Sequence, residues 1–239
     1  MFKKMSLFAA VMAIAIMAIA APVLAMTPIN TVFSEDWSMD AQGDLISESY
    51  QWTGDNTTFV VGAGEVGNLV ANEGNDWVWT QADFGAQMDG QTWQLFHFDV
   101  TGENTSGSDT NRMNIYVLDE NGNQWLRWFG DGGRLIPRLG GNVGTAAQTI
   151  NDGWHDFDIL YNSTTGSAQW FNDGSLVYSL TTGVGKYMSR VEINNGYGQL
   201  GNTITLDNIM VGTVPEPSGL LALGGLGLTA LGMIKRRRA

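Results

Sequence analysis

The sequence predicts an all-β protein, an antiparallel β-sandwich flanked by two specialised ends. Residues 26–214 contain 26 of the 31 glycines of the chain, a density that disfavours long helices. Apolar and polar residues alternate there with the period of two that is typical of half-buried strands. Turn residues recur about every ten positions, the spacing found in sandwiches and barrels.

The first 25 residues have the three parts of a secretory signal peptide. Lys3 and Lys4 form the positive start, an apolar run covers 5–20, and Val23 and Ala25 suit the −3 and −1 positions of a cleavage site. Cleavage by signal peptidase after Ala25 would leave an exported chain. The alternative is a retained membrane anchor, for which the apolar run is short.

The predicted strands lie between this segment and the tail. In 94–100, Phe96, Phe98 and Val100 share one face, and 112–117 has the same pattern. The Asn-Gly pair at 121–122 is a strong hairpin signal. Eleven strands are expected: 58–61, 68–71, 77–80, 94–100, 112–117, 124–129, 154–161, 167–171, 176–180, 189–193 and 203–211. They suffice for one domain over 26–213.

Composition excludes several classes of protein. The chain has no cysteine, which rules out disulfides, zinc–thiolate sites, iron–sulfur clusters and cysteine nucleophiles. Residues 26–214 carry six basic and 23 acidic residues, so their net charge repels nucleic-acid phosphates. Nucleic acid is therefore not expected as a partner.

The tail combines three features in order. Pro215, Glu216 and Pro217 precede an apolar stretch over 219–234, which is followed by four cations. The cations are Lys235, Arg236, Arg237 and Arg238. Residues 214–239 resemble the PEP-CTERM sorting signal of Gram-negative bacteria.

That resemblance implies a single transmembrane helix and recognition by an exosortase-type membrane protease. The helix would hold the chain transiently in the inner membrane, with the basic end in the cytoplasm, before transfer to the cell surface or an exopolysaccharide biofilm matrix. An ordinary single-span tail is the alternative.

A second resemblance covers much of the middle. The segments 33–37, 154–159, 168–177 and 206–209 are similar to those of laminin-G-like and concanavalin-like jelly rolls, and to carbohydrate-binding jelly rolls. The resemblance implies a two-sheet sandwich and favours glycan binding, although fold analogy alone does not assign a function.

Tryptophan supplies the candidate binding residues. All nine tryptophans lie between 37 and 170, and their flat faces suit the apolar faces of sugar rings. Trp77 and Trp79 would share one strand face, and Trp125 would share a face with Arg127, opposite Trp128. These five residues are the candidate glycan site. The alternative is core packing, which we expect for one tryptophan of each such pair.

Acidic residues near the first and last strands suggest one metal site. Glu35 and Asp36 would meet Asp207 if these strands are neighbours, and their carboxylates could bind a structural calcium ion. A solvated acidic rim is the alternative. No other cofactor is expected.

The sequence gives little support for catalysis. It lacks the Glu-x-Asp-x-Glu pattern of concanavalin-like glycanases, a Gly-x-Ser-x-Gly elbow and a phosphate loop. Both histidines, His97 and His155, are expected to be structural. The sequence thus predicts a non-catalytic, surface-sorted protein that binds polysaccharide. A structural or adhesive matrix protein that binds proteins or itself is the second interpretation, and a glycan hydrolase the third.

Overall fold

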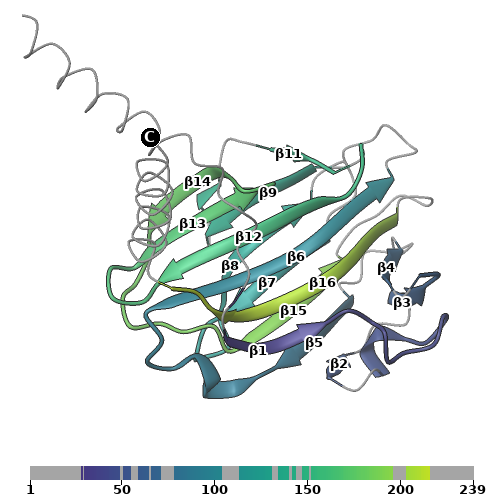
Figure 1. Cartoon of the computed structure of the whole chain (residues 1–239), viewed down its shortest axis with the longest axis horizontal. Helices are drawn as coiled ribbons and strands as arrows, with labels where there is room; N and C mark the ends of the chain where they lie inside the picture. Colours follow the sequence, from purple (N-terminus) through teal and green to yellow (C-terminus); the bar gives the residue numbers. More distant parts are fainter. Residues whose placement is uncertain are drawn as a thin grey trace, which may run out of the picture.

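The chain forms a sandwich of two antiparallel sheets (Figure 1). The computed structural model describes residues 28, 30–48, 51–54, 59–64, 66–70, 78–103, 113–130, 134–139, 142–143, 147–150, 152–195 and 203–215. Within these ranges, helix is limited to two short 3₁₀ segments, η1 (Ile46–Glu48) and η2 (Gly85–Met88). The predicted all-β sandwich is confirmed.

Sheet A has the order β14-β13-β12-β6-β16-β4-β3, with β1 also paired to β16. Its strands are β1 (Asn30–Glu35), β3 (Phe59–Gly62), β4 (Val66–Val70), β6 (Trp93–Glu103), β12 (His155–Asn162), β13 (Ser167–Asn172), β14 (Ser175–Thr181) and β16 (Thr203–Thr213).

Sheet B has the order β10-β9-β8-β7-β15-β5-β2, with β11 also paired to β9. Its strands are β2 (Trp52–Gly54), β5 (Val78–Asp83), β7 (Met113–Leu118), β8 (Gln124–Gly130), β9 (Arg134–Leu139), β10 (Asn142–Val143), β11 (Gln148–Thr149) and β15 (Arg190–Asn195).

The described part of the chain contains every one of the eleven predicted strands and five more. The additional strands are β1, β2, β9, β10 and β11. Most of these are short or lie near a sheet edge, where a period of two is hard to detect. In β9, Pro137 interrupts the pattern, because proline cannot donate a ladder hydrogen bond.

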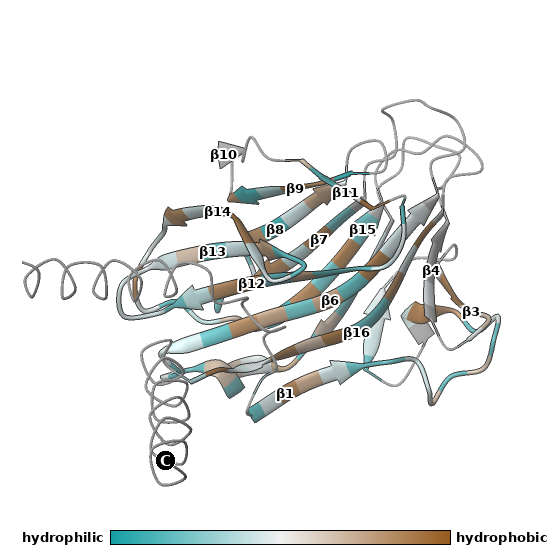
Figure 2. Ribbon diagram, turned by 45° about the horizontal axis from the view of Figure 1, so that its top comes forward, coloured by the Kyte–Doolittle hydropathy of each residue, from teal (hydrophilic) through white to brown (hydrophobic). Residues whose placement is uncertain are grey.

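The core lies between the inner faces of the two sheets. Phe96, Phe98 and Val100 of β6 are all buried in it, as their alternation predicts. Trp128 and Trp170 enter the same core from sheets B and A. Hydrophobic and hydrophilic positions alternate visibly along several strands (Figure 2). The residues between the inward ones therefore form the outer face of each sheet.

Two hairpins have the turn chemistry that their sequences predict. The Asp119 N–H donates to Asn123 O at 3.0 Å across the β7–β8 turn, and Gly122 has a φ of +73°. Asp173 and Gly174, between β13 and β14, have φ values of +47° and +68°. Positive φ at both central positions matches the twist of a two-residue hairpin.

The described helices are too short to cross a membrane. The predicted signal peptide, 1–25, and residues 216–239 of the predicted sorting signal lie outside the described residues.

Candidate functional site

The outer face of sheet B brings polar and aromatic side chains together from strands far apart in sequence. Thr80, Ile115, Trp128 and Ile193 of its strands point into the core, so their neighbours along each strand point outward. Strand register arranges these neighbours in two rows across the sheet. The first row is Trp79, Asn194, Asn114 and Phe129, and the second is Gln81, Glu192, Tyr116, Arg127 and Arg138.

A hollow of about 380 Å³ lies on this face, lined by residues of both rows and one neighbour. The lining residues are Trp79, Gln81, Tyr116, Gln124, Glu192 and Asn194. Three of these are primary amides, which both donate and accept hydrogen bonds. Such a surface can pair with hydroxyl groups while an aromatic face contacts C–H groups.

Glu192 is the centre of a hydrogen-bond network in the hollow. Its Oε1 accepts from Gln124 Nε2 at 3.2 Å and from Asn194 Nδ2 at 3.0 Å. Asn194 Oδ1 accepts in turn from Asn114 Nδ2 at 3.0 Å. Asn114 Oδ1 is buried and receives no hydrogen bond from the described residues. The network fixes the amide groups, so that little side-chain entropy is left to lose on binding.

Arginine and aromatic side chains pack together beside the hollow. Arg127 Nη1 donates to Tyr116 Oη at 3.1 Å, and its Cζ lies 5.4 Å from the Tyr116 ring centroid. Arg138 Cζ lies 3.8 Å from the centroid of Phe129. These cation–π contacts hold the guanidinium groups against the rings.

The structure separates the five residues predicted to bind glycan. Trp79 and Arg127 lie on the outer face of sheet B, and Trp79 lines the hollow. Trp77 lies outside the described residues. Trp128 is 0% exposed and packs edge-on against Phe157, with ring centroids 4.7 Å apart. It is a core residue, which corrects its assignment to a binding surface.

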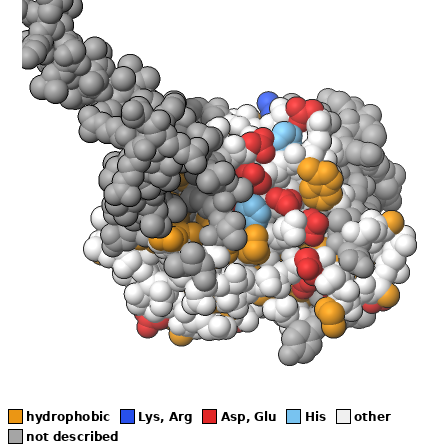
Figure 3. All heavy atoms as spheres, in the orientation of Figure 1, with side chains coloured by type: hydrophobic (Ala, Val, Ile, Leu, Met, Phe, Trp, Pro, Cys, Tyr) orange, Lys and Arg blue, Asp and Glu red, His pale blue; other side chains and the backbone are white. Residues whose placement is uncertain are grey.

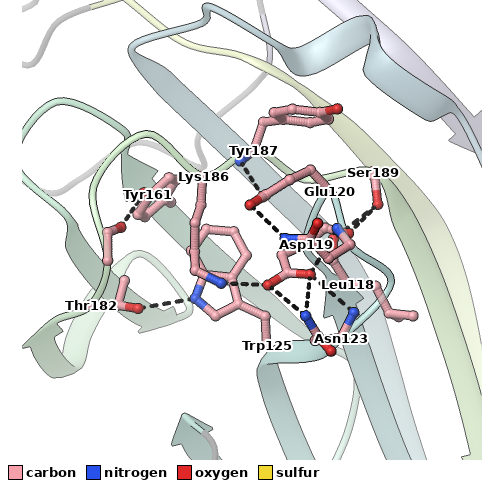
Figure 4. A network of polar contacts seen from close by, with 12 residues as sticks. Leu118, Asp119, Glu120, Asn123, Trp125, Tyr161, Thr182, Lys186, Tyr187 and Ser189 are labelled. Atoms are coloured by element: carbon pink, nitrogen blue, oxygen red, sulfur yellow. Dashed lines mark hydrogen bonds and ion pairs between the residues drawn. The ribbon is translucent and has the colours of Figure 1, made fainter.

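Trp125 also belongs to the core, and the prediction that it shares a face with Arg127 is wrong. A register shift in the β7–β8 pair, between Val117 and Leu118, turns Trp125 inward. Its ring meets Tyr161 at 4.5 Å, and its Nε1 donates to Thr182 Oγ1 at 3.0 Å (Figure 4). Such a bulge puts two successive residues on one side of a strand.

A polar network fixes the loop over Trp125 (Figure 4). Asp119 accepts hydrogen bonds from the N–H of Asn121 and of Asn123, and forms an ion pair with Lys186. Ser189 Oγ donates to Asp119 O at 2.6 Å. Burial opposes ionisation of Asp119, but these hydrogen bonds outweigh it and lower its pKa. The network therefore ties the 182–189 loop to the β7–β8 turn, in a structural role.

The predicted calcium ligands lie on neighbouring strands but have separate partners. β1 pairs with β16, with Glu35 opposite Ile209. Glu35 accepts from the Trp37 N–H at 2.9 Å and from Trp52 Nε1 at 3.0 Å, and burial raises its pKa. Asp36 Oδ1 accepts a hydrogen bond from Ser38 Oγ. Asp207 Oδ1 accepts one from the N–H of Asn208. In the described ranges no three acidic or histidine side chains form a metal-binding group.

The outer face of sheet A carries a band of acidic and histidine side chains (Figure 3). His97 Nδ1 lies 2.8 Å from Asp158 Oδ1, and its Nε2 lies 3.4 Å from Asp99 Oδ1. Burial alone would lower the pKa of His97, but the two carboxylates outweigh it and raise this pKa to about 9. Asp99 also accepts from Asn208 Nδ2 at 2.7 Å.

His155 has an equivalent arrangement at the end of β12. Its Nδ1 lies 2.8 Å from Asp173 Oδ2, and its Nε2 lies 2.8 Å from Asp152 Oδ1. Burial works against protonation, but the hydrogen bonds to Asp173 and Asp152 raise the pKa of His155. Both histidines thus have each ring nitrogen within 3.4 Å of a carboxylate oxygen, and their structural role stays a prediction.

Sequence reasoning missed most residues of the hollow. Gln81, Tyr116, Glu192 and Asn194 are the polar members of strands recognised by their apolar members. The available signal was the set of polar residues that alternate with the apolar ones in each strand and therefore point outward. It becomes a site only when β15 lies between β7 and β5, an order that local patterns do not encode.

Comparison with known proteins identifies the fold and no family. No family model matches the chain, and no curated protein matches it in sequence. The carbohydrate recognition domain of Emp47p has a TM-score of 0.57 at 9% identity, with 79% of this chain and 98% of that one covered.

Two further solved structures have the same fold. An endo-acting O-glycanase of the human gut microbiota has a TM-score of 0.57 at 10% identity, covering 78% of this chain and 100% of that one. A carbohydrate esterase of the Shiga toxin-encoding bacteriophage phi24B has a TM-score of 0.53 at 13% identity, with 77% of this chain and 99% of that one covered. The chain is similar to carbohydrate-binding jelly-roll domains in its β-sandwich fold.

Proposed function

We propose that this protein is a non-catalytic glycan-binding protein and that the outer face of sheet B is its binding surface. The hollow lined by Trp79, Tyr116, Glu192 and three amides carries this proposal. The partly exposed ring of Trp79 suits a sugar ring, whereas Tyr116 is buried at the base of the hollow, and the fixed amides suit hydroxyl groups. The fold shared with a carbohydrate recognition domain supports it.

The carboxylates of this face favour binding over hydrolysis. Glycoside hydrolases use a pair of carboxyl groups on either side of the scissile bond. Glu192 is the one acidic residue among those that line the hollow. Asp83, further along the same face, is held by Arg190 Nη2 at 2.6 Å and Nε at 3.2 Å. We therefore propose that the protein binds its glycan without cleaving it.

Export and sorting by the two ends of the chain are part of the proposal. Signal peptidase would act on 1–25, and an exosortase-type protease on 214–239. The acidic domain would then act at the cell surface or in the exopolysaccharide matrix of a Gram-negative bacterium. Calcium at Glu35, Asp36 and Asp207 stays a prediction.

A polysaccharide-binding screen tests the function. The full chain, purified in mild detergent, is titrated against neutral and charged polysaccharides with calcium and with chelator, and each mixture is assayed for shortened glycan. We expect saturable binding without cleavage to at least one polysaccharide. Absence of binding to all of them would overturn the proposal, and glycan shortening that Glu192→Gln abolishes would replace it with hydrolysis. The chelator arm tests the calcium site.

Self-association is the second candidate, and strand β14 favours it. β14 is the edge of sheet A and pairs only with β13 among the described strands. Residues 175–181 carry no charge, and Leu176 is 53% exposed. Exposed, uncharged edge strands can pair with a second copy. Sedimentation velocity tests this: Leu176→Lys should dissolve any oligomer, and a monomeric wild-type chain would exclude it.

A further inference from the structure

Four arginines lie on the outer face of sheet B, although the chain is strongly acidic. Arg127, Arg134 and Arg138 come from β8 and β9, and Arg190 comes from β15. Arg190 is paired with Asp83, so the basic part of the sheet is formed by strands β7 to β11, which contain Arg127, Arg134 and Arg138 and no acidic residue.

The acidic residues gather elsewhere. On sheet A, Asp99 and Asp156 face each other across β6 and β12, and Asp158 follows on the same face. Charges more than a Debye length of about 8 Å apart are largely screened at physiological ionic strength. A group bound to sheet B therefore experiences its arginines more strongly than the acids of sheet A, and net charge does not predict its affinity.

Two of the arginines are adjacent and held in place. Register pairs Arg127 with Arg138 across β8 and β9, which puts their Cβ atoms about 5 Å apart. Phe129 supports Arg138, and Tyr116 supports Arg127. The Nε atoms of both arginines are buried and Arg127 Nη1 donates to Tyr116, so a ligand would meet the Nη side of each guanidinium, whose planar N–H donors match the oxygens of a carboxylate.

The arginine pair and the hollow are parts of one surface. Arg127 and Arg138 continue the row that begins with Gln81 and Glu192 in the hollow. From β5 to β9 this row crosses four inter-strand steps of about 4.8 Å, a total of about 19 Å. A ligand on this row would span several sugar units, with neutral contacts at one end and cationic contacts at the other.

We propose that the ligand of this face is an anionic polysaccharide, whose carboxylate or sulfate groups bind Arg127 and Arg138 while neutral sugar positions occupy the hollow. This inference rests on the proposed glycan-binding function and specifies its substrate class. It commits to a glycan rather than a nucleic acid because neutral sugar units can lie beside Glu192 in the hollow, whereas a nucleic acid carries a phosphate at every nucleotide.

Charge-matched ligands test the inference. Affinities of the full chain are measured for polygalacturonate and its methyl ester, and for a sulfated galactan and its desulfated form. We expect each acidic polymer to bind at least tenfold more tightly than its neutral match. Arg138→Gln should weaken acidic binding about tenfold, the equivalent of one charged hydrogen-bonding group, and leave neutral binding unchanged. The affinity of Arg138→Lys for the acidic polymers should lie between those of the wild type and Arg138→Gln.

Ser179→Glu is the matched control, since it makes the same change in net charge on the exposed outer face of sheet A. It should alter affinity less than twofold, and equal melting temperatures would exclude misfolding. Equal affinity for acidic and neutral polymers, unchanged by Arg138→Gln, overturns this inference and leaves the glycan-binding function standing. No polysaccharide binding overturns both, and equally tight binding of single-stranded poly(dT) assigns the face to nucleic acid.

Discussion

The two sheets use the same alternation but present different outer faces. On sheet A, His97 lies between Asp158 and Asp99, and Asn208 donates to Asp99. These charged groups pair with one another, although Asp158 Oδ2 is buried without a hydrogen bond from the described residues. On sheet B, three amides, two aromatic rings and Glu192 line a hollow of about 380 Å³, and Arg127 lies beside it against Tyr116. The comparison teaches that polar side chains on the outside of a sheet indicate a ligand surface only where they line a hollow.

Apolar residues strengthen the contrast. Leu95, Leu160 and Phe171 form a small second cluster with Val214, with Trp93 packed against it. Register places Leu95 opposite Leu160 on the outer side of sheet A. Part of that face is therefore built like a core, whereas the large side chains on the outside of sheet B stand among polar groups.

The largest expected effect separates core tryptophans from exposed ones. Trp128→Ala should lower the free energy of unfolding by about 3–5 kcal/mol, because it empties a fully buried site. Trp154, which is 51% exposed, is the control, and Trp154→Ala should cost under about 0.5 kcal/mol. Urea denaturation measures both. Similar losses for the two variants would contradict the core assignment of Trp128.

The second expected effect breaks the balance of charge on sheet A. The folded pKa of His97 is raised from 6.5 to about 9. Its stabilisation is therefore complete below pH 6.5 and lost as pH rises through 9, a change of about 3 kcal/mol. Asp158→Asn should flatten the stability profile between pH 7 and 10. An NMR titration of His97 near 6.5 in the wild type would contradict the pairing.

The third effect tests the face of sheet B directly. Trp79→Ala should weaken polysaccharide binding about 30-fold, since an aromatic residue central to a contact surface typically contributes about 2 kcal/mol. Trp154→Ala again serves as the control and should bind like the wild type. Isothermal titration with the best polysaccharide of the screen measures both. A larger loss in the control would move the site away from sheet B.

The smallest effect concerns the turn beside the hollow. Gly122 has a φ of +73°, and an added Cβ would meet no heavy atom within 4 Å. Gly122→Ala should therefore cost about 1–2 kcal/mol from backbone conformation alone. Gly122→Asn should retain more stability, because asparagine tolerates this region better. Equal melting temperatures for the two variants would contradict a left-handed turn.

The sequence revealed the fold more fully than the site. Turn residues and alternation located the meander of β12, β13 and β14, because both signals are local. The hollow joins Trp79, Tyr116 and Glu192 from three strands whose order is set by long-range pairing. The error at Trp125 has a similar origin, since a one-residue bulge reverses every inference drawn from parity.

One measurement tests most directly whether sheet B is the ligand face. The nine tryptophan indole N–H signals are assigned by NMR, and a bound polysaccharide is titrated into the labelled chain. We expect the Trp79 signal to shift in a saturable way, while the signals of Trp128 and Trp154 stay in place. Saturable binding that shifts Trp154 and leaves Trp79 unchanged would contradict the assignment.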